Sequence, residues 1–330
     1  MTFSIIIPVY NRPDEIADLL ESLCQQTDKG FETIIVEDGS TVRCLEQVKQ
    51  YDGLLDIQYF YKDNEGRSIA RNYGMERARG DYFIFVDSDC ILPPEYIATL
   101  RDELERNYTD FYGGPDAAHE SFTDTQKAIN FAMTAFLTTG GIRGGKIQME
   151  KFVPRTFNMG LARRVFDKVG GFREMFSEDI DMSTRIRNAG YSPQLIRDVY
   201  VYHKRRGNLR KFWRQVHVFG MSRITLQLLY PGSMKAVHWM PAIFTVGSAG
   251  LITASFFQPW ALLPLGVYIA ALWGSALHST RSLKIATKAV AASLIQLYGY
   301  GTGFIRAYVW KILLRHGRDE QQEIEMRKGK

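Results

Sequence analysis

The sequence predicts an α/β protein, in which a domain built on a mostly parallel sheet is followed by C-terminal membrane helices. Short apolar runs rich in β-branched and aromatic residues alternate with helical segments through the first half of the chain. This alternation is typical of βαβ units. Residues 236–280 contain no Asp, Glu, Lys or Arg. Because a membrane span needs about 20 apolar residues, this uncharged stretch is long enough for two spans joined by a turn.

The elements of the α/β part follow from hydrophobic periodicity. Strands are predicted at 3–9, 31–36, 57–61, from Asp81 onward, at 110–113 and at 199–202. Helices are predicted at 13–24, 42–50, 68–79 and 94–107. A Gly-rich stretch at 140–145 lacks the preceding strand and the spacing of a phosphate-binding loop. We expect a flexible active-site loop there instead.

Charge is unevenly distributed along the chain. Residues 1–198 carry 23 Lys and Arg against 32 Asp and Glu, whereas residues 199–318 carry 15 basic residues and no acidic one. A basic block of this length suits nucleic acid or anionic lipid. Because its basic residues flank apolar spans, we expect membrane lipids as partners and no nucleic acid. Cys24, Cys44 and Cys90 form no CxxC pair, which favours a reducing compartment.

The predicted membrane region is 236–318. It contains a hairpin of helices at 239–258 and 260–278, and a third segment at 289–305 that either spans the bilayer or lies in its interface. The loop 281–288 carries three basic residues and the turn at Gln258-Pro259 carries none. The positive-inside rule therefore puts that loop and the N-terminal domain in the cytoplasm. With no signal peptide expected, these features predict a multi-pass protein of the inner (cytoplasmic) membrane; a pair of buried core helices is the soluble alternative.

The region 206–235 is expected to hold a basic amphipathic helix, at 209–229, on the membrane surface. Phe212, Trp213, Val216 and Phe219 recur near helical spacing, with basic residues among them. An ordinary packed helix is the alternative. The expected boundaries are thus 1–205 for the α/β domain, 206–235 for the interface helix, 236–318 for the membrane region and 319–330 for a charged tail.

Two carboxylates, Asp87 and Asp89, follow the apolar run that begins at Asp81. In open α/β sheets ligands bind beyond the carboxyl ends of the strands. Hard oxygen ligands of this kind suit Mg²⁺ or Mn²⁺ carrying a diphosphate. Taken alone, such a pair is also typical of a helix cap or a solvated turn.

Further motifs accompany this pair in a fixed order. They are Pro8-Val9-Tyr10-Asn11, Glu37-Asp38-Gly39-Ser40, Asn64-x-Gly66, Ala70-Arg71-Asn72-x-Gly74, Asp87-Ser88-Asp89, Asn158-Met159-Gly160, Val169-Gly170-Gly171-Phe172 and Ser177-Glu178-Asp179-Ile180-Asp181. Together they resemble the family 2 glycosyltransferases with the GT-A fold, of the membrane-anchored bacterial type. The resemblance covers residues 3–195.

The resemblance implies a nucleotide-sugar site with a divalent metal. Asp38, as an exposed carboxylate, would accept a hydrogen bond from the nucleobase, and Arg71 would neutralise a phosphate. The metal, Mg²⁺ or Mn²⁺, would offset charge on the leaving nucleoside diphosphate. The implied donor-binding residues are Pro8, Val9, Tyr10, Asn11, Asp38, Arg71, Asp87 and Ser88, and the implied metal ligands are Asp89, Asp87 and His203. A turn aspartate, a solvated helix-face arginine and a structural histidine are the alternatives for Asp38, Arg71 and His203.

Asp179 aligns with the family's catalytic base, which would remove the proton of the acceptor hydroxyl. The alternative is a helix N-terminus capped by Ser177, with acidic residues that merely favour the helix dipole. The residues implied in acceptor binding are Asn158, Met159, Glu178 and Asp181, of which Glu178 and Asp181 would bind acceptor hydroxyls or orient the base.

The implied function is inverting transfer of a hexosyl or N-acetylhexosaminyl group from a UDP- or GDP-sugar to a lipid-linked glycan, a step of polysaccharide biosynthesis at the cytoplasmic membrane face. The QxxRW motif of processive synthases is absent, since the nearest segment is Arg210-Lys211-Phe212-Trp213-Arg214-Gln215. A polyprenyl phosphate is the alternative acceptor, and being anionic it would need no base. A noncatalytic membrane scaffold that binds nucleotide-sugar is the alternative from another class, and a homo-oligomer stays open.

Overall fold

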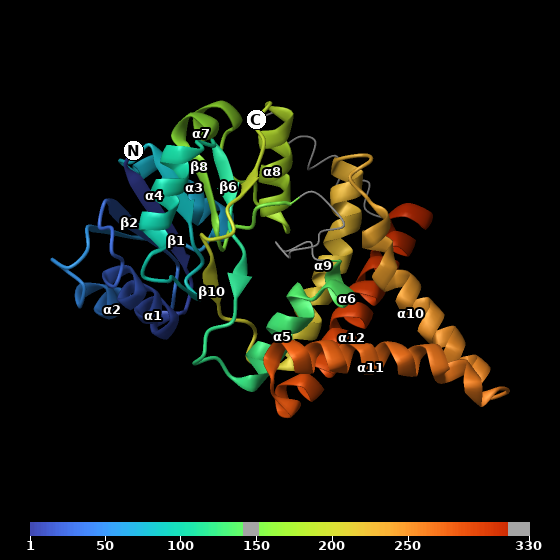
Figure 1. Ribbon diagram of the computed structural model, residues 1–330. Coiled ribbons are helices and arrows are strands. Elements are labelled where there is room, and N and C mark those ends of the chain that lie inside the picture. Colours follow the sequence, from blue (N-terminus) through green and yellow to red (C-terminus); the bar gives the residue numbers. More distant parts are fainter. Residues whose placement is uncertain (141–151, 316–330) are drawn as a thin grey trace. The chain divides into compact units, whose positions relative to one another are not determined.

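The computed structural model describes residues 1–140 and 152–315 (Figure 1). The chain divides into two compact units, which are described separately below. The first comprises Met1–Glu120 and Ile142–Lys204, and the second comprises Ser121–Gly141 and Arg205–Lys330. The α/β domain expected at 1–205 is therefore interrupted by a segment that belongs with the C-terminal helices.

A seven-stranded sheet forms the first unit, in the order β3-β2-β1-β4-β8-β6-β9. Its strands are β1 (Phe3–Val9), β2 (Phe31–Asp38), β3 (Ile57–Lys62), β4 (Tyr82–Phe85), β6 (Phe111–Gly113), β8 (Met159–Ala162) and β9 (Gln194–Leu195). The first four strands in this order are parallel to one another. Only β8 runs against its neighbours β4 and β6. The predicted α/β fold with a mostly parallel sheet is thus confirmed.

The central strands carry almost continuous apolar runs because both faces of the sheet are covered. Ile5, Ile6 and Ile7 of β1 are fully buried, as are Phe83 and Ile84 of β4. The helices of this unit are α1 (Pro13–Cys24), α2 (Leu45–Lys49), α3 (Arg67–Arg77), α4 (Tyr96–Arg106), α7 (Arg163–Val169) and α8 (Glu178–Asn188).

Several element boundaries differ from the sequence prediction. Strand β2 continues through Asp38, and α2 begins at Leu45 instead of residue 42. Helix α3 ends at Arg77, because the backbone N–H of Arg79 donates to Glu32 at 2.6 Å and draws the chain out of the helix. The run that begins at Asp81 is a strand only over β4, so the acidic residues that follow lie in irregular backbone.

A second, three-stranded sheet lies in the same unit, in the order β5-β10-β7. Its strands are β5 (Cys90–Ile91), β10 (Val201–His203) and β7 (Asp116–Ala117). Strand β10 is antiparallel to β5 and parallel to β7. This small sheet brings three segments that are far apart in the sequence into one layer.

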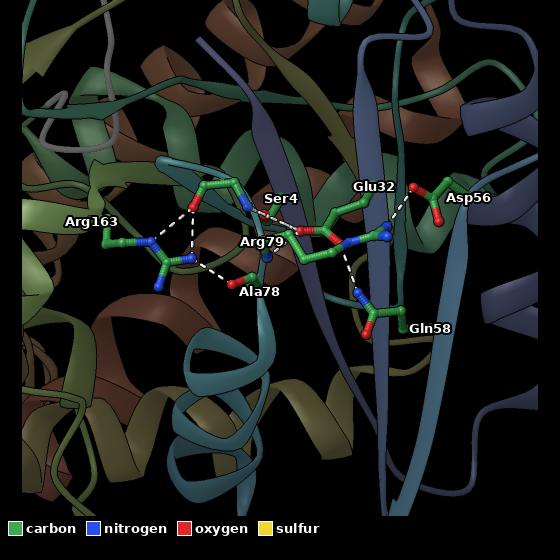
Figure 2. A network of polar contacts seen from close by, with 8 residues as sticks. Ser4, Glu32, Asp56, Gln58, Ala78, Arg79 and Arg163 are labelled. Atoms are coloured by element: carbon green, nitrogen blue, oxygen red, sulfur yellow. Dashed lines mark hydrogen bonds and ion pairs between the residues drawn. The ribbon is translucent and has the colours of Figure 1, made fainter.

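At the amino edge of the large sheet a buried carboxylate, Glu32, joins three strands (Figure 2). It accepts hydrogen bonds from Ser4 Oγ at 2.6 Å, Gln58 Nε2 at 2.6 Å and Arg79 Nε at 2.8 Å. Burial alone would raise the pKa of Glu32, but the hydrogen bonds from Ser4 and Arg79 outweigh burial and lower the pKa. Arg163 extends the network by donating to the carbonyl of Gly80 at 3.0 Å.

The second unit is helical. It contains α5 (Asp124–Thr134), α6 (Phe136–Thr139), α9 (Leu209–Leu229), α10 (Ala236–Ser255), a 3₁₀ turn (Pro259–Leu262), α11 (Leu263–Thr280), α12 (Leu283–Ala307) and a π-helical turn (Tyr308–Leu313). Helix α5 belongs here because its apolar face, with Ile129 and Met133, is buried against Phe212 and Ala292. The sequence alone gave no sign of these long-range partners.

Helices α9 and α12 approach each other through glycines. A Cβ on Gly220 would lie 2.1 Å from the carbonyl oxygen of Tyr300, and one on Gly303 would lie 2.0 Å from that of His217. Helix α9 spans the predicted residues 209–229, with Phe212 and Val216 fully buried. Helix α12 is longer than the predicted segment 289–305 and buries one of its faces.

Among the described residues, two helical segments are long and apolar enough to cross a membrane, Ala236–Ser255 and Pro259–Thr280. They overlap the predicted hairpin at 239–258 and 260–278. Many of their apolar side chains are exposed, including Ile243, Val246, Trp260 and Val267. Their large apolar surface is a feature that needs a covering partner.

We predict that Glu32→Gln destabilises the full-length protein at pH 7 by about 1–3 kcal/mol, because buried donors lose a charged acceptor. Thermal unfolding in detergent measures the loss. Since the pKa of Glu32 is lowered from 4.5 in the folded state, its stabilisation is present above pH 4.5 and is lost as the pH falls through the folded value. The difference in unfolding free energy between the variant and the wild type should therefore disappear at acid pH.

Asp56→Asn is the matched control for this prediction. Asp56 pairs with the same arginine, Arg79, at 2.5 Å, but its side chain is 58% exposed. Its loss should cost less than about 1 kcal/mol. Equal effects of the two substitutions would contradict the assigned importance of Glu32.

Candidate functional site

Acidic and basic side chains gather beyond the carboxyl ends of the parallel strands. Strand β1 leads into Asn11, β2 ends in Asp38, and β4 is followed by Asp87 and Asp89. Because parallel strands end at the same edge of a sheet, these residues lie at one edge. The structure therefore brings three of the sequence motifs together there.

Asp89, Cys90 and His203 form a cluster that can hold a metal ion. One ligand atom from each residue lies within 4.8 Å of the others. His203 Nε2 is 3.2 Å from Asp89 Oδ1, since the pairing of β10 with β5 sets His203 opposite Cys90. A carboxylate and an imidazole are ligands that suit first-row divalent cations such as Mn²⁺. The sequence motifs grouped Asp89 with His203 and gave Cys90 no role in the site.

Arg71 is neither a solvated arginine nor a free phosphate ligand. It is 1% exposed, and it donates to Asp87 Oδ1 at 2.6 Å and to Glu178 Oε1 at 3.1 Å. Its guanidinium also faces the ring of Phe172, with 5.6 Å between the Cζ atom and the ring centroid. The expected phosphate contact of Arg71 stays a prediction; in this structure Arg71 joins the loop after β4 to the start of α8.

Glu178 is held by two arginines. Besides Arg71, it accepts from Arg67 Nη2 at 2.7 Å and is 2% exposed. Both of its oxygens are engaged by cations within the protein, and the acceptor contact expected of Glu178 stays a prediction. Arg67 was not selected from the sequence, although it follows Gly66 directly in the Asn64-x-Gly66 motif.

Asp179 is more accessible than Glu178, with 17% of its side chain exposed. Its Oδ2 accepts from Arg155 Nη1 at 3.2 Å, and its Oδ1 accepts from the N–H of Ile180 at 2.8 Å. Burial alone would raise the pKa of Asp179, but Arg155 and Arg67 outweigh burial and lower the pKa. Asp179 is therefore ionised at neutral pH. Arg155 lies outside every motif recognised in the sequence.

Three other residues expected to bind the acceptor are interior. Asp181 is fully buried and pairs with Arg185 at 2.9 Å and Arg173 at 3.3 Å. Asn158 is fully buried, and its amide donates to the carbonyl of Val199 at 2.9 Å. Met159 lies in the core of β8. None of the three offers exposed surface in this structure, and the acceptor contacts expected of them stay predictions.

Asp38 is also enclosed, at 3% exposure, and is not the exposed carboxylate that the sequence suggested. The backbone N–H groups of Glu65 and Gly66 donate to it at 3.0 and 2.8 Å. Lys62 Nζ lies 3.0 Å from its Oδ1. This correction has a local cause, because the loop after β3 folds over the end of β2 and satisfies its carboxylate.

The segment after β1 is shaped by its asparagine. Asn11 has a φ of 53°, and its Oδ1 accepts from the N–H groups of Thr41 and Val42, both at 2.9 Å. Tyr10 is 51% exposed, whereas Val9 is buried. Pro8 is partly exposed, and Ser88 is buried beside the acidic pair. The donor contacts expected of these residues stay predictions.

The alternative in which Ser177 caps α8 is not favoured. Ser177 has a φ of 67° and makes no capping hydrogen bond through its side chain.

The Gly-rich loop expected at 140–145 lies outside the described residues, except for Gly140, which ends α6 with a φ of 64°.

The sequence profile described as glycosyl transferase family 2 matches residues 4–170. An uncharacterized glycosyltransferase of Rickettsia bellii is 45% identical over 86 residues, which are 26% of this chain and 12% of that protein. The glycosyltransferase AglE of Haloferax volcanii is 26% identical over 251 residues, covering 69% of this chain and 77% of that protein. The chain spans less than a third of the length of each of the first curated relatives that it matches.

Solved structures share the fold. The mannosyltransferase PcManGT from Pyrobaculum calidifontis, in complex with GDP-Man and Mn²⁺, has a TM-score of 0.57 at 16% identity and covers 94% of this chain and 87% of its own. TarS 1-349 of S. aureus, in complex with UDP-GlcNAc, has a TM-score of 0.50 at 18% identity and covers 92% of this chain and 91% of its own. At these identities the likeness concerns the fold alone.

We predict that Arg71→Met destabilises the full-length protein by about 3–5 kcal/mol, because it leaves the carboxylates of Asp87 and Glu178 without their shared cation. Thermal unfolding in detergent measures this loss. Arg77→Met, on the same helix, removes an arginine that is 37% exposed, and it should cost less than about 1 kcal/mol. Similar losses for the two variants would show that the bridge contributes little.

Proposed function

The chain belongs to glycosyl transferase family 2, and within that family we propose that it transfers one sugar, with inversion, from a nucleotide-sugar to a lipid-linked glycan at the cytoplasmic membrane face. Family membership and the GT-A fold follow from the profile match and the shared fold. The observation that supports the proposal best is the convergence at one sheet edge, where Arg71 joins Asp87 to Glu178, the residue before Asp179.

The donor we propose is a UDP- or GDP-sugar that carries a hexosyl or N-acetylhexosaminyl group. PcManGT is described with GDP-Man and TarS with UDP-GlcNAc, and these descriptions support the class without choosing the base. We propose Pro8, Val9, Tyr10, Asn11 and Ser88 as donor contacts. Asp38 then acts through the loop it holds, since its carboxylate already accepts from Glu65 and Gly66.

The metal ligands we propose are Asp89 and His203, with Asp87 beside them. Their donor atoms fit a divalent cation, and PcManGT is described with Mn²⁺. A bound Mn²⁺ or Mg²⁺ would offset the negative charge on the departing diphosphate. Arg12, whose Nη1 lies 3.9 Å from Asp89 Oδ2, adds positive charge at the same place.

Asp179 is the proposed general base. In an inverting transfer the acceptor oxygen attacks C1 of the sugar while the C1–O bond to the diphosphate breaks, and the bond's electron pair leaves with the diphosphate. The proton of the acceptor hydroxyl passes to the Asp179 carboxylate. A lowered pKa keeps that carboxylate ionised at neutral pH, which is the protonation state that a general base requires. Arg67 and Arg155 lie close enough to orient it.

A polyprenyl phosphate as acceptor is a second candidate, and one contact favours it. Arg155 already pairs with Asp179, and a base must be released from its cation before it accepts a proton. An anionic phosphate acceptor needs no base. The two candidates therefore differ in how much turnover depends on Asp179.

The membrane assignment is also part of the proposal. We propose that α10 and α11 cross the inner membrane, that α9 presents Arg210, Lys211 and Arg214 to anionic lipid, and that the catalytic unit lies in the cytoplasm. The exposed apolar surface of α10 and α11 supports this. Tethering at the bilayer would raise the effective concentration of a lipid-linked acceptor.

We predict that Asp179→Asn lowers turnover on a hydroxyl acceptor by about 10²–10⁴-fold, because the general base is lost, while donor binding is kept. The assay follows UDP or GDP released from a panel of nucleotide-sugars by protein in detergent, with and without EDTA. Asp167→Asn, an exposed acid on α7, should leave turnover unchanged. Near-full turnover of Asp179→Asn would show that Asp179 is not the general base and would favour a polyprenyl phosphate as acceptor. Nucleotide release that stays at background with every donor and acceptor would favour the noncatalytic scaffold instead.

We predict that Val246→Arg shifts the protein out of the alkali-resistant membrane fraction. Arginine near the centre of a spanning helix costs about 2.5–3.5 kcal/mol of insertion free energy, and Val246 lies mid-helix on exposed surface of α10. Val42→Arg, at an equally exposed valine of the first unit, should leave fractionation unchanged. Retention of wild type and both variants in a detergent-free soluble fraction would contradict the membrane assignment.

A further inference from the structure

Asp116, on β7, is an aspartate whose side chain is fully buried. Removing a carboxylate from water is costly unless charge or hydrogen bonds compensate for it. The imidazole of His203, which is 15% exposed, lies beside it and gives Asp116 a role that sequence motifs did not indicate. Asp116 directly follows Gly113-Gly114-Pro115, a stretch that indicates only a break in regular structure.

Strand pairing sets the relation between the two side chains. In the small sheet β10 lies between β5 and β7, and Val201 of β10 pairs with Asp116. His203 Nε2 is 3.2 Å from Asp89 Oδ1, and His203 Nδ1 is 3.9 Å from Asp116 Oδ2. The two ring nitrogens thus face carboxylates on opposite sides of the imidazole.

The ring has little freedom to turn away from this arrangement. The ring of Phe157 packs against it, with 4.7 Å between the centroids and 33° between the planes. On the Asp89 side, the N–H of Lys204 donates to the Asp89 carbonyl at 2.8 Å and ties the backbone of β10 to the acidic loop. The direction of His203 is therefore defined by several elements of the first unit.

A histidine that binds a metal through Nε2 must carry its proton on Nδ1, because a protonated nitrogen has no lone pair to give. A carboxylate that faces Nδ1 selects this tautomer, fixes the ring and makes the ligand more basic. At 3.9 Å the two atoms are within ion-pair range but beyond hydrogen-bond range.

We infer that Asp116 is a positioning residue for the metal site: it holds His203 with Nδ1 protonated, so that Nε2 faces the divalent cation beside Asp89. The inference rests on the proposed metal ligands. Asp116 itself does not touch the metal, the donor or the acceptor. Its effect on catalysis passes entirely through the imidazole.

The test measures the affinity of the full-length protein in detergent for Mn²⁺ alone, by following free Mn²⁺ with electron paramagnetic resonance. Four proteins form a cycle: wild type, Asp116→Asn, His203→Ala and the double variant. Asp116→Asn should weaken Mn²⁺ binding about 10–100-fold in the wild-type background. In the His203→Ala background the same substitution should change the affinity less than about twofold, because the imidazole it positions is gone.

Asp110→Asn is the matched control, since Asp110 pairs with Arg164 at 2.6 Å, away from the small sheet. It should leave Mn²⁺ affinity unchanged. Asp116→Ser is measured beside Asp116→Asn, and thermal unfolding reports whether each variant is folded. If both variants unfold the protein, the carboxylate serves the fold and the inference is overturned.

The remaining outcomes separate the inference from the metal assignment. If His203→Ala leaves Mn²⁺ affinity unchanged, the proposed metal ligand is wrong and the inference falls with it. If His203→Ala weakens binding but Asp116→Asn does not, the metal ligand stands and the inference is wrong. Equal weakening by Asp116→Asn in both backgrounds would mark a general structural effect and would also overturn it.

Discussion

The candidate site depends on the buried bridge that Arg71 makes between Asp87 and Glu178. Asp87 lies in the loop after β4 and Glu178 begins α8. The guanidinium of Arg71 therefore joins two segments that are about ninety positions apart in the sequence. A buried arginine is costly to desolvate, and two carboxylates at hydrogen-bond distance compensate for that cost. Because Asp89 and Asp179 neighbour the two bridged acids, their relative position follows from this contact. Rigid supporting contacts of this kind hold reactive groups within the narrow tolerance that catalysis requires.

The sequence predicted the class of the fold and its regular elements well where the pattern was local. Strand β1 and helix α1 have the predicted bounds, since an apolar run and an apolar stripe flanked by polar residues specify them without help from distant segments. Boundaries were wrong where a distant side chain intervened, as at the end of α3, where Glu32 captures the N–H of Arg79. The segment 121–141 could not be assigned to the helical unit, because the partners that bury α5 lie about 80 to 160 positions later in the chain.

For the site, the motifs identified which residues converge but not what each one touches. Arg71, Glu178, Asp181 and Asn158 belong to recognised motifs, yet each is buried and bonded within the protein. A motif indicates which residue type occupies a position. Its spacing alone does not show whether that residue binds a ligand or supports a neighbouring side chain. Arg155 and Asp116 show the converse, since they have no motif and acquire a role only through strand pairing and ion pairing. The burial of each side chain separates these two roles, and burial could not be obtained from the sequence.

The glycine contacts between α9 and α12 have a mechanical consequence. Where Gly220 and Gly303 let one helix backbone touch the other, no layer of side chains is available to absorb sliding or tilting. Close-packed interiors resist such shear, because any displacement opens a void on one side and a collision on the other. We therefore expect α9 and α12 to move together, so that a displacement of α12 would be transmitted to α9.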